Sequence, residues 1–138
     1  MRFLLVEDDP DHAWLVRREF ELHRADAALE HVDDAERALD RLRGAERSPD
    51  VLLVDLDLPR KSGLELLSVL RAEPRWRGIR AVVLTTSSAD ADRRRASALA
   101  DGFVTKPVGL VEFRRVIGEL VDHWVDRCRA GATVGSPT

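Results

Sequence analysis

Acidic side chains stand directly after two short apolar segments of this sequence. Glu7, Asp8 and Asp9 follow the run RFLLV, and Asp55 follows the run VLLV, with Asp57 two residues further on. A cluster of carboxylates without histidine or cysteine favours a hard cation, and Mg²⁺ typically takes one or two carboxylates together with water and phosphate oxygens. If the fold brings the two acidic groups together, the pattern predicts a magnesium site rather than a zinc site.

Hydroxyl and cationic side chains follow two later apolar segments in the same way. Thr85 and Thr86 end the run AVVLTT, and Lys106 follows the run FVT. Lys106 and Lys61 are the two lysines among the 22 basic residues, which suggests that Lys106 marks a position needing a compact ammonium. An ammonium and a hydroxyl suit the charge that develops on a phosphoryl group in transfer. A metal would relieve the repulsion between the carboxylates and leave Asp55 as the nucleophile.

These segments belong to a regular alternation of strands and helices. We predict strands over residues 2–6, 27–32, 50–54, 79–85 and 102–105, and helices over 10–22, 34–43, 62–72, 89–100 and 110–128. Strands that alternate with helices across short loops form a parallel sheet with helices on both faces. The unbroken apolar runs VLLV and AVVL are typical of central strands buried on both faces. Ligands of such sheets bind beyond the carboxyl ends of the strands, where all the polar side chains above are expected.

Length and composition limit the kind of protein this can be. With 138 residues, 44% of them hydrophobic, the chain is expected to form one domain with one continuous core. The single cysteine, Cys128, cannot form an internal disulfide, which favours a cytoplasmic location. No apolar run approaches the roughly 20 residues that span a bilayer, so we expect a soluble protein. The net charge of -3 gives no overall field that would attract nucleic acid or an anionic membrane.

Four motifs carry a resemblance to a known family. VEDDP, VDLDLPRKSG, VVLTTS and FVTKPV occur in this order at the ends of four predicted strands. Together they resemble the response-regulator receiver domain of two-component signalling, over nearly the whole chain. The resemblance implies an α/β fold of the flavodoxin-like (βα)5 type, with a doubly wound parallel sheet of five strands. We expect a receiver domain over residues 1–129 and a flexible tail over 130–138, where the sequence is small and polar.

The resemblance implies roles for the acidic residues. Asp55 would be the phosphoacceptor, and Glu7 and Asp8 would be the acidic pair that holds Mg²⁺ together with Asp55. The backbone carbonyl of Asp57 would complete the coordination of the metal. Asp9 is expected to cap the helix that follows it. Capping of that helix is also the alternative interpretation of the whole acidic group, because acids stabilise helix N-termini.

The resemblance also implies a switch. Thr85 would be the hydroxyl that follows the phosphoryl group, in preference to Thr86, because Leu84 holds the usual position before it. Lys106 would be the ion-pair partner of the phosphoryl group and would precede a cis Pro107. The domain would thus be a phosphoacceptor signalling protein rather than an enzyme, although it would catalyse its own phosphotransfer and a slow autodephosphorylation.

The partners implied are those of a signalling switch. The stretch VLTTSS, the absence of an output domain, and a last helix with Phe113 and His123-Trp124 resemble stand-alone receivers that act with bacteriophytochrome histidine kinases. Phe103 stands where many receivers carry tyrosine, and its lack of a hydroxyl argues against a tyrosine-type readout. We expect a sensor histidine kinase and an unknown downstream protein as partners, with no direct binding of nucleic acid or membrane.

The last predicted helix carries an apolar stripe that is expected to lie mostly in the core. Its members are Phe113, Ile117, Leu120, Val121 and Trp124. The edge of this stripe could instead form a homodimer, through the helix over 89–100, the strand over 102–105 and the helix over 110–128. We expect the run Arg93 to Arg95 to be a solvated helix face, and the three tryptophans to be packing residues.

Two other functions remain open at this point. A strand ending in DxD with a later threonine and lysine also resembles the haloacid-dehalogenase phosphatases, but here the acidic pair precedes the nucleophile, and no acid follows Lys106 until Glu112. The other alternative is a receiver-like docking module that works without phosphorylation. Modification of Asp55 by a small phosphodonor, and its dependence on magnesium, distinguish the alternatives.

Overall fold

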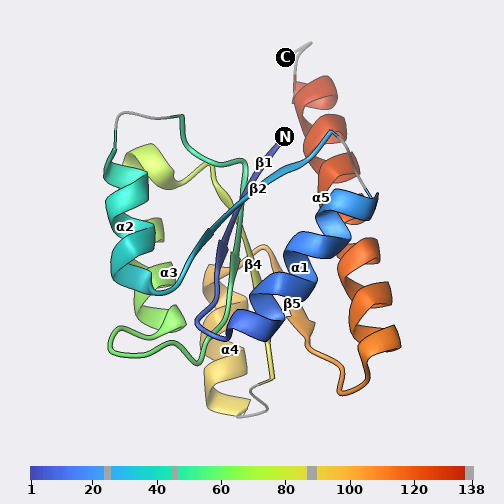
Figure 1. Ribbon diagram of the computed structural model, residues 1–138. Coiled ribbons are helices and arrows are strands. Elements are labelled where there is room, and N and C mark those ends of the chain that lie inside the picture. Colours follow the sequence, from blue (N-terminus) through green and yellow to red (C-terminus); the bar gives the residue numbers. More distant parts are fainter. Residues whose placement is uncertain (24–25, 45–46, 87–89, 136–138) are drawn as a thin grey trace.

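Five strands alternate with five α-helices in the computed structural model, which describes all residues except 24–25, 45–46, 87–89 and 136–138 (Figure 1). The strands are β1 (Arg2–Val6), β2 (Ala28–Val32), β3 (Val51–Val54), β4 (Arg80–Thr85) and β5 (Gly102–Thr105). The helices are α1 (Pro10–His23), α2 (Ala35–Arg43), α3 (Gly63–Ala72), α4 (Asp90–Leu99) and α5 (Leu110–Gly135). A short 3-10 helix, η1 (Pro74–Trp76), was not predicted. Every predicted element is present.

The strands form one parallel sheet in the order β2-β1-β3-β4-β5. Val6 at the end of β1 lies opposite Val32 of β2 on one side and Val54 of β3 on the other. At the far side of the sheet, Thr85 of β4 lies opposite Thr105 of β5. The strand order reverses between β1 and β3, which is the place where doubly wound sheets bind their ligands. The predicted fold class is therefore confirmed.

Helices cover both faces of the sheet, with α2, α3 and α4 on one face and α1 and α5 on the other (Figure 1). Successive side chains of a strand point to opposite faces. Leu4 and Leu52 pack in the core beneath α2 and α3, whereas Leu5 and Leu53 pack in the core beneath α1 and α5. A buried leucine contributes about 1.5–3 kcal/mol, so two apolar faces hold each central strand firmly. This explains why VLLV shows no alternation of polar and apolar residues.

The apolar stripe of α5 packs against the sheet, as predicted. Its residues Phe113, Ile117, Leu120, Val121 and Trp124 are each at most 4% exposed. The opposite face of the helix is charged, and Arg115 forms ion pairs with Glu112 and Glu119 at 2.7 Å. Neither α5 nor another helix of the described residues combines the length and apolar character needed to cross a membrane.

Two backbone features differ from the sequence-based expectation. α5 ends at Gly135 rather than near Cys128, because residues 129–135 contain no proline and each further helical residue adds one backbone hydrogen bond. The division of the chain into a domain and a tail stays a prediction. The described peptide bonds are all trans, including the one before Pro107, so the predicted cis bond is wrong. A trans bond is favoured by about 0.5–1 kcal/mol before proline, and the motif alone does not override this preference.

α4 has little apolar contact with the rest of the domain. Among its described side chains, Ala96 is buried and Leu99 is half-buried. The run Arg93 to Arg95 is exposed, which confirms the predicted solvated face. The guanidinium of Arg93 lies 4.8 Å from the ring centre of Phe103 on β5, and this cation–π contact links α4 to the neighbouring strand.

The three tryptophans do not behave alike. Trp76 and Trp124 are buried in the two cores, as predicted. Trp14 on α1 is 62% exposed, so its prediction as a packing residue is wrong. Ala13, Val16 and Phe20 form the buried side of α1 at helical spacing, and Trp14 lies off that side.

Candidate functional site

The acidic residues of the turn after β1 make different contacts. The backbone N–H of Glu7 donates to the Val32 carbonyl at 3.1 Å, so β1 stays paired with β2 up to this point. Asp9 caps α1, because its Oδ1 accepts from the backbone N–H groups of Asp11 at 2.9 Å and His12 at 3.3 Å. The predicted cap is confirmed. The carboxylate of Glu7 instead turns inward and is 2% exposed, which capping alone does not explain.

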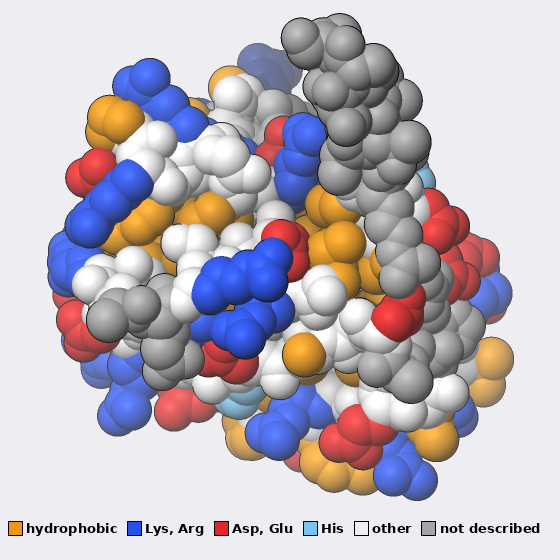
Figure 2. All heavy atoms as spheres, turned by 90° about the horizontal axis from the view of Figure 1, so that it is seen from above, with side chains coloured by type: hydrophobic (Ala, Val, Ile, Leu, Met, Phe, Trp, Pro, Cys, Tyr) orange, Lys and Arg blue, Asp and Glu red, His pale blue; other side chains and the backbone are white. Residues whose placement is uncertain are grey.

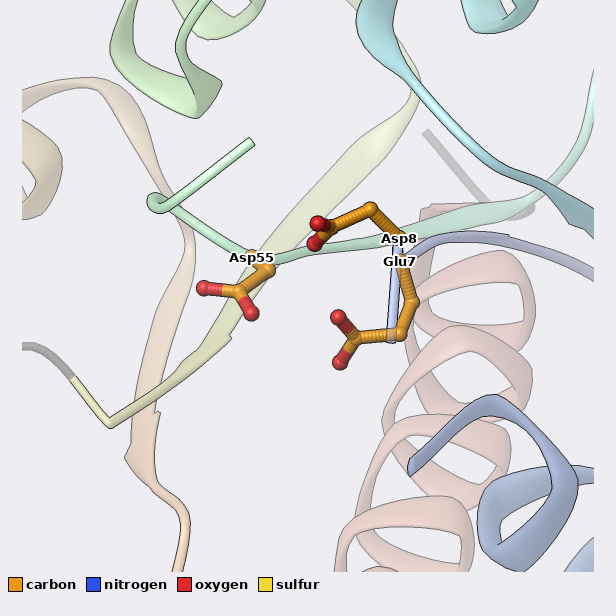
Figure 3. A group of neighbouring side chains, drawn as sticks. All are labelled: Glu7, Asp8 and Asp55. Atoms are coloured by element: carbon orange, nitrogen blue, oxygen red, sulfur yellow. The ribbon is translucent and has the colours of Figure 1, made fainter. Parts of the chain in front are cut away.

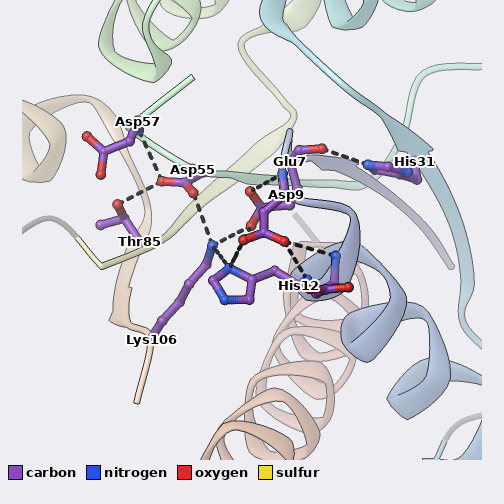
Figure 4. A network of polar contacts seen from close by, with 9 residues as sticks. Glu7, Asp9, His12, His31, Asp55, Asp57, Thr85 and Lys106 are labelled. Atoms are coloured by element: carbon purple, nitrogen blue, oxygen red, sulfur yellow. Dashed lines mark hydrogen bonds and ion pairs between the residues drawn. The ribbon is translucent and has the colours of Figure 1, made fainter. Parts of the chain in front are cut away.

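Asp55 directly follows β3 and is 7% exposed. Its Oδ1 accepts from the backbone N–H of Asp57 at 3.0 Å and from Thr85 Oγ1 at 2.8 Å (Figure 4). Its Oδ2 accepts from Lys106 Nζ at 3.0 Å. Of the two threonines, Thr85 contacts the Asp55 carboxylate and Thr86 is exposed, while the role of Thr85 as the switch hydroxyl stays a prediction. A buried carboxylate is tolerated because its oxygens are hydrogen-bonded in this way.

The loop after Asp55 brings α3 close to the carboxylate. The Gly63 N–H donates to the Leu56 carbonyl at 3.2 Å, and a Cβ at Gly63 would lie 2.3 Å from the carbonyl oxygen of Asp55. Glycine is therefore required at this close approach. Within the same loop Arg60 has a left-handed backbone with φ of 63°, and its guanidinium donates to the Asp34 carboxylate at the start of α2. This contact offsets part of the roughly 1–2 kcal/mol cost of that conformation.

Lys106 reaches from the end of β5 to both acidic groups. Its backbone N–H donates to the Thr85 carbonyl at 2.9 Å, which extends the pairing of β4 with β5. Its ammonium is 1% exposed and donates to the carboxylates of Glu7 and Asp55 (Figure 4). It also lies 3.0 Å from Nδ1 of His12. The structure thus joins β1, β3 and β5 through one buried cation.

Three carboxylates meet above the sheet edge. Glu7, Asp8 and Asp55 each offer an oxygen within 4.8 Å of the others, and their carboxylates surround a common space (Figure 3). Asp8 is exposed, whereas the other two are buried. This all-oxygen set contains no imidazole or thiolate, so it fits a hard divalent cation. Asp57 contributes its N–H to the Asp55 carboxylate, and a role for its carbonyl stays a prediction.

Burial and neighbouring groups shift the pKa values of the two buried carboxylates, Glu7 and Asp55, in opposite directions. Burial raises the pKa of Glu7 to about 7, although contact with Lys106 lowers it, and the charge of Asp55 raises it further. Burial also raises the pKa of Asp55, but the Asp57 N–H, the ammonium and the threonine hydroxyl together hold its pKa below the usual value. Burial and the neighbouring Asp55 charge raise the pKa of Asp57. At neutral pH Asp55 is therefore ionised, which is the form a nucleophile requires.

Two histidines at the site were not predicted. His12 lies beside Lys106, and Nε2 of His31 donates to the backbone carbonyl of Glu7 at 2.8 Å. The sequence offered a weak signal for His12, because it stands in the first turn of a helix whose start carries the acidic group. His31 lies at the end of β2, next to β1, and only the strand order shows that it reaches Glu7.

Comparison with known proteins decides the family. Residues 3–118 match the family described as the response regulator receiver domain. The chain belongs to this family. A curated relative, the probable methanogenesis regulatory protein FilR2 of Methanothrix harundinacea, is 39% identical over 127 residues, which cover 88% of this chain and 82% of the relative. The receiver is therefore a phosphoacceptor response regulator of two-component signalling, and the phosphatase alternative is not retained.

Solved structures of other receivers share the fold over almost their whole length. The Mn²⁺-bound response regulator Rcp1 superposes with a TM-score of 0.83 and 28% identity, covering 89% of this receiver and 93% of Rcp1. The phosphorylated cyanobacterial phytochrome response regulator RcpA superposes with a TM-score of 0.84 and 26% identity, covering 90% of this receiver and 93% of RcpA. With the acidic cluster of Glu7, Asp8 and Asp55, these similarities indicate that the receiver binds a divalent metal.

Proposed function

We propose that Asp55 accepts a phosphoryl group from a phosphohistidine of a sensor histidine kinase, in a reaction that depends on Mg²⁺. The observation that carries this proposal is the set of contacts at Asp55, an ionised and buried carboxylate held by Lys106 and Thr85 beside two further acids. Glu7, Asp8 and Asp55 would hold the ion, together with the carbonyl of Asp57. When bound, Mg²⁺ would neutralise the acids and stabilise charge on the phosphoryl oxygens.

The proposed transfer is a displacement at phosphorus. An Asp55 carboxylate oxygen attacks the phosphorus, its lone pair forms the new O–P bond, and the P–N bond to the kinase imidazole breaks with its electron pair going to nitrogen. Lys106 and Thr85 then donate to the phosphoryl oxygens instead of to the carboxylate. Slow attack of water on the same phosphorus restores Asp55 and releases inorganic phosphate, which is the proposed autodephosphorylation.

Intact mass after incubation with acetyl phosphate tests this chemistry. Wild type with Mg²⁺ should gain the mass of one phosphoryl group, whereas wild type with chelator and Asp55→Asn with Mg²⁺ should gain none. Phosphorylation of the Asp55→Asn variant would sink the assignment of the acceptor. If wild type gains nothing under either condition, the docking-module alternative becomes the leading hypothesis.

We further propose that the kinase is a bacteriophytochrome. The similarity of the receiver to RcpA, a cyanobacterial phytochrome response regulator, supports this choice of partner. Phosphate transfer from an autophosphorylated phytochrome kinase should be at least tenfold faster than transfer from an unrelated sensor kinase at equal concentration. Equal rates from the two kinases would contradict the proposal. A cytoplasmic location stays a prediction.

A homodimer through α4, β5 and α5 is the proposed output surface. A groove on this face is lined by Phe103, Val104, Leu120 and Trp124, so apolar side chains from the strand and the helix border it. Movement of Thr85 and Lys106 toward the phosphoryl group would act on β4 and β5 directly beneath this face. Light scattering should therefore show a larger mass for the phosphorylated receiver than for the unmodified one, and Val104→Glu should remove the difference.

A further inference from the structure

His12 is held on two sides at the edge of the phosphorylation site. It is the third residue of α1, and its backbone N–H donates to the capping carboxylate of Asp9 at 3.3 Å. Its ring stacks on the ring of Phe113 from α5, with centroids 5.5 Å apart and planes inclined by 30°. A cap and an aromatic stack therefore fix both the backbone and the ring of this residue.

The ring nitrogen that faces the site acts as an acceptor. Nδ1 lies 3.0 Å from Lys106 Nζ, within hydrogen-bond distance (Figure 4). An ammonium has only donors, so the hydrogen bond runs from the lysine to the imidazole. The carboxylate oxygens of Glu7 and Asp9 lie 3.8 and 3.7 Å from Nδ1, beyond the distance at which the ring would donate to them.

This contact completes the surroundings of the Lys106 ammonium. An ammonium has three N–H donors, and here the acceptors are the carboxylates of Glu7 and Asp55 and the imidazole of His12. The two carboxylates change when the site works, because Asp55 becomes an acyl phosphate and Glu7 is a proposed metal ligand. Of these three acceptors, His12 is the one that neither becomes phosphorylated nor is a proposed metal ligand.

We propose that His12 is a positioning residue for phosphoryl transfer, which holds the Lys106 ammonium in place through Nδ1. The proposal rests on the proposed function of Asp55. Without this acceptor the third N–H would have no partner inside the site, and the ammonium would turn toward solvent to find one. Lys106 would then spend less time where it contacts the phosphoryl group.

Two substitutions separate the acceptor from the aromatic stack. His12→Phe keeps a ring against Phe113 but has no acceptor, whereas His12→Asn has an acceptor oxygen near the position of Nδ1 but no ring. The rate of Asp55 phosphorylation by acetyl phosphate at saturating Mg²⁺ should fall roughly tenfold in His12→Phe. His12→Asn should recover most of that loss. Arg18→Gln, an exposed change on the same helix, should leave the rate unchanged.

The other outcomes contradict the proposal. Equal rates in wild type and His12→Phe would show that the acceptor does not matter for transfer. Equal losses in His12→Phe and His12→Asn would show that the ring or the local fold matters, and not the hydrogen bond. Absence of phosphorylation in wild type would instead defeat the proposed function of Asp55.

A spectroscopic measurement tests the contact without phosphorylation. In ¹⁵N NMR spectra of wild type at pH 8, His12 should show an unprotonated Nδ1 and a protonated Nε2. Lys106→Met should shift the Nδ1 resonance, because the hydrogen bond to it is lost. A proton on Nδ1 in wild type, or an unchanged resonance in Lys106→Met, would overturn the proposal whatever the acetyl phosphate experiment shows.

Discussion

The two ends of the sheet carry charge in different ways. At the carboxyl end, three carboxylates lie within 4.8 Å of one another, and the Lys106 ammonium contacts two of them. At the amino end, which Figure 2 shows, basic side chains near the centre of the face lie next to acidic ones. There the Asp101 carboxylate accepts from Arg71 at 2.8 Å and from the Ala81 N–H at 2.8 Å, with Arg80 at 3.7 Å.

The difference separates structural charge from functional charge. The contacts of Asp101 fasten β4 and β5 to α3, and they balance an acid with cations in partial contact with water. The gathering of acids at Asp55 opposes folding, because like charges repel and burial penalises them. A cluster that opposes folding in this way is expected at a functional site, and a divalent cation would offset its repulsion.

Loss of the cation should have the largest effect on stability. Lys106→Met leaves two buried carboxylates without their ammonium, so we expect a loss on the order of 3–5 kcal/mol in urea unfolding with chelator present. Arg80→Met at the amino end is the matched control and should change stability by less than about 0.5 kcal/mol. Similar losses in the two variants would remove the distinction between the two ends.

Replacing a glycine by alanine should cost more stability at the carboxyl end of the sheet than at the amino end. Gly63→Ala forces a Cβ to within 2.3 Å of the Asp55 carbonyl oxygen, so a loss of about 1–3 kcal/mol is expected. Gly78, before β4 at the amino end, has nothing within 4 Å of a built Cβ. Gly78→Ala should be neutral or stabilising by a few tenths of a kcal/mol. Thermal unfolding of both variants checks this, and a tolerated Gly63→Ala would contradict the close approach.

The raised pKa of Glu7 predicts how the stability of the metal-free protein depends on pH. Folding raises the pKa of Glu7 from 4.5 to about 7, so in this window the folded state binds a proton that the unfolded chain has lost. This contribution is present in full below pH 4.5 and is lost as the pH rises through 7, by on the order of 1–3 kcal/mol. Glu7→Gln should abolish that slope in chelator-treated samples. A slope that survives in the variant would assign the effect to another group.

The smallest effect on stability is expected at Asp8. Its carboxylate is exposed, so Asp8→Asn in chelator should change the free energy of unfolding by less than about 0.5 kcal/mol. The variant should nevertheless lose most of the stabilisation by Mg²⁺, which for wild type is about 2.7 kcal/mol at 100 times the dissociation constant. Unfolding at a series of Mg²⁺ concentrations measures both quantities, and full stabilisation of Asp8→Asn by Mg²⁺ would exclude Asp8 as a ligand.

The sequence predicted most of the fold and the centre of the site. The run VLLV is apolar on both faces and ends in an acid, so its place in the middle of a parallel sheet and the position of Asp55 followed directly. Lys106 follows β5 and Thr85 ends β4, and parallel strands bring residues at their carboxyl ends to one edge of the sheet. The choice of Thr85 over Thr86 came from the resemblance to receivers. These predictions rest on local patterns that the sheet then aligns.

The features that escaped prediction depend on contacts between distant residues. The hydrogen bond between Lys106 and His12 joins residues 94 positions apart, and no spacing in the sequence marks it. The left-handed backbone of Arg60 depends on the loop geometry and its contact with Asp34. The trans bond before Pro107 differs little in energy from the cis form, so the surrounding fold decides it.

Because α4 has little apolar contact with the rest of the domain, it should open more easily than the central strands. Its described side chains bury Ala96 and half-bury Leu99, and Arg71 Nε donates to the Leu99 carbonyl at 2.8 Å. The helix can therefore open and reclose while β1 and β3 remain intact, at a free-energy cost below that of global unfolding. Its amides should exchange with solvent hydrogen sooner than those of the central strands. Local opening of α4, next to β5, is therefore expected to need less free energy than unfolding of the whole receiver.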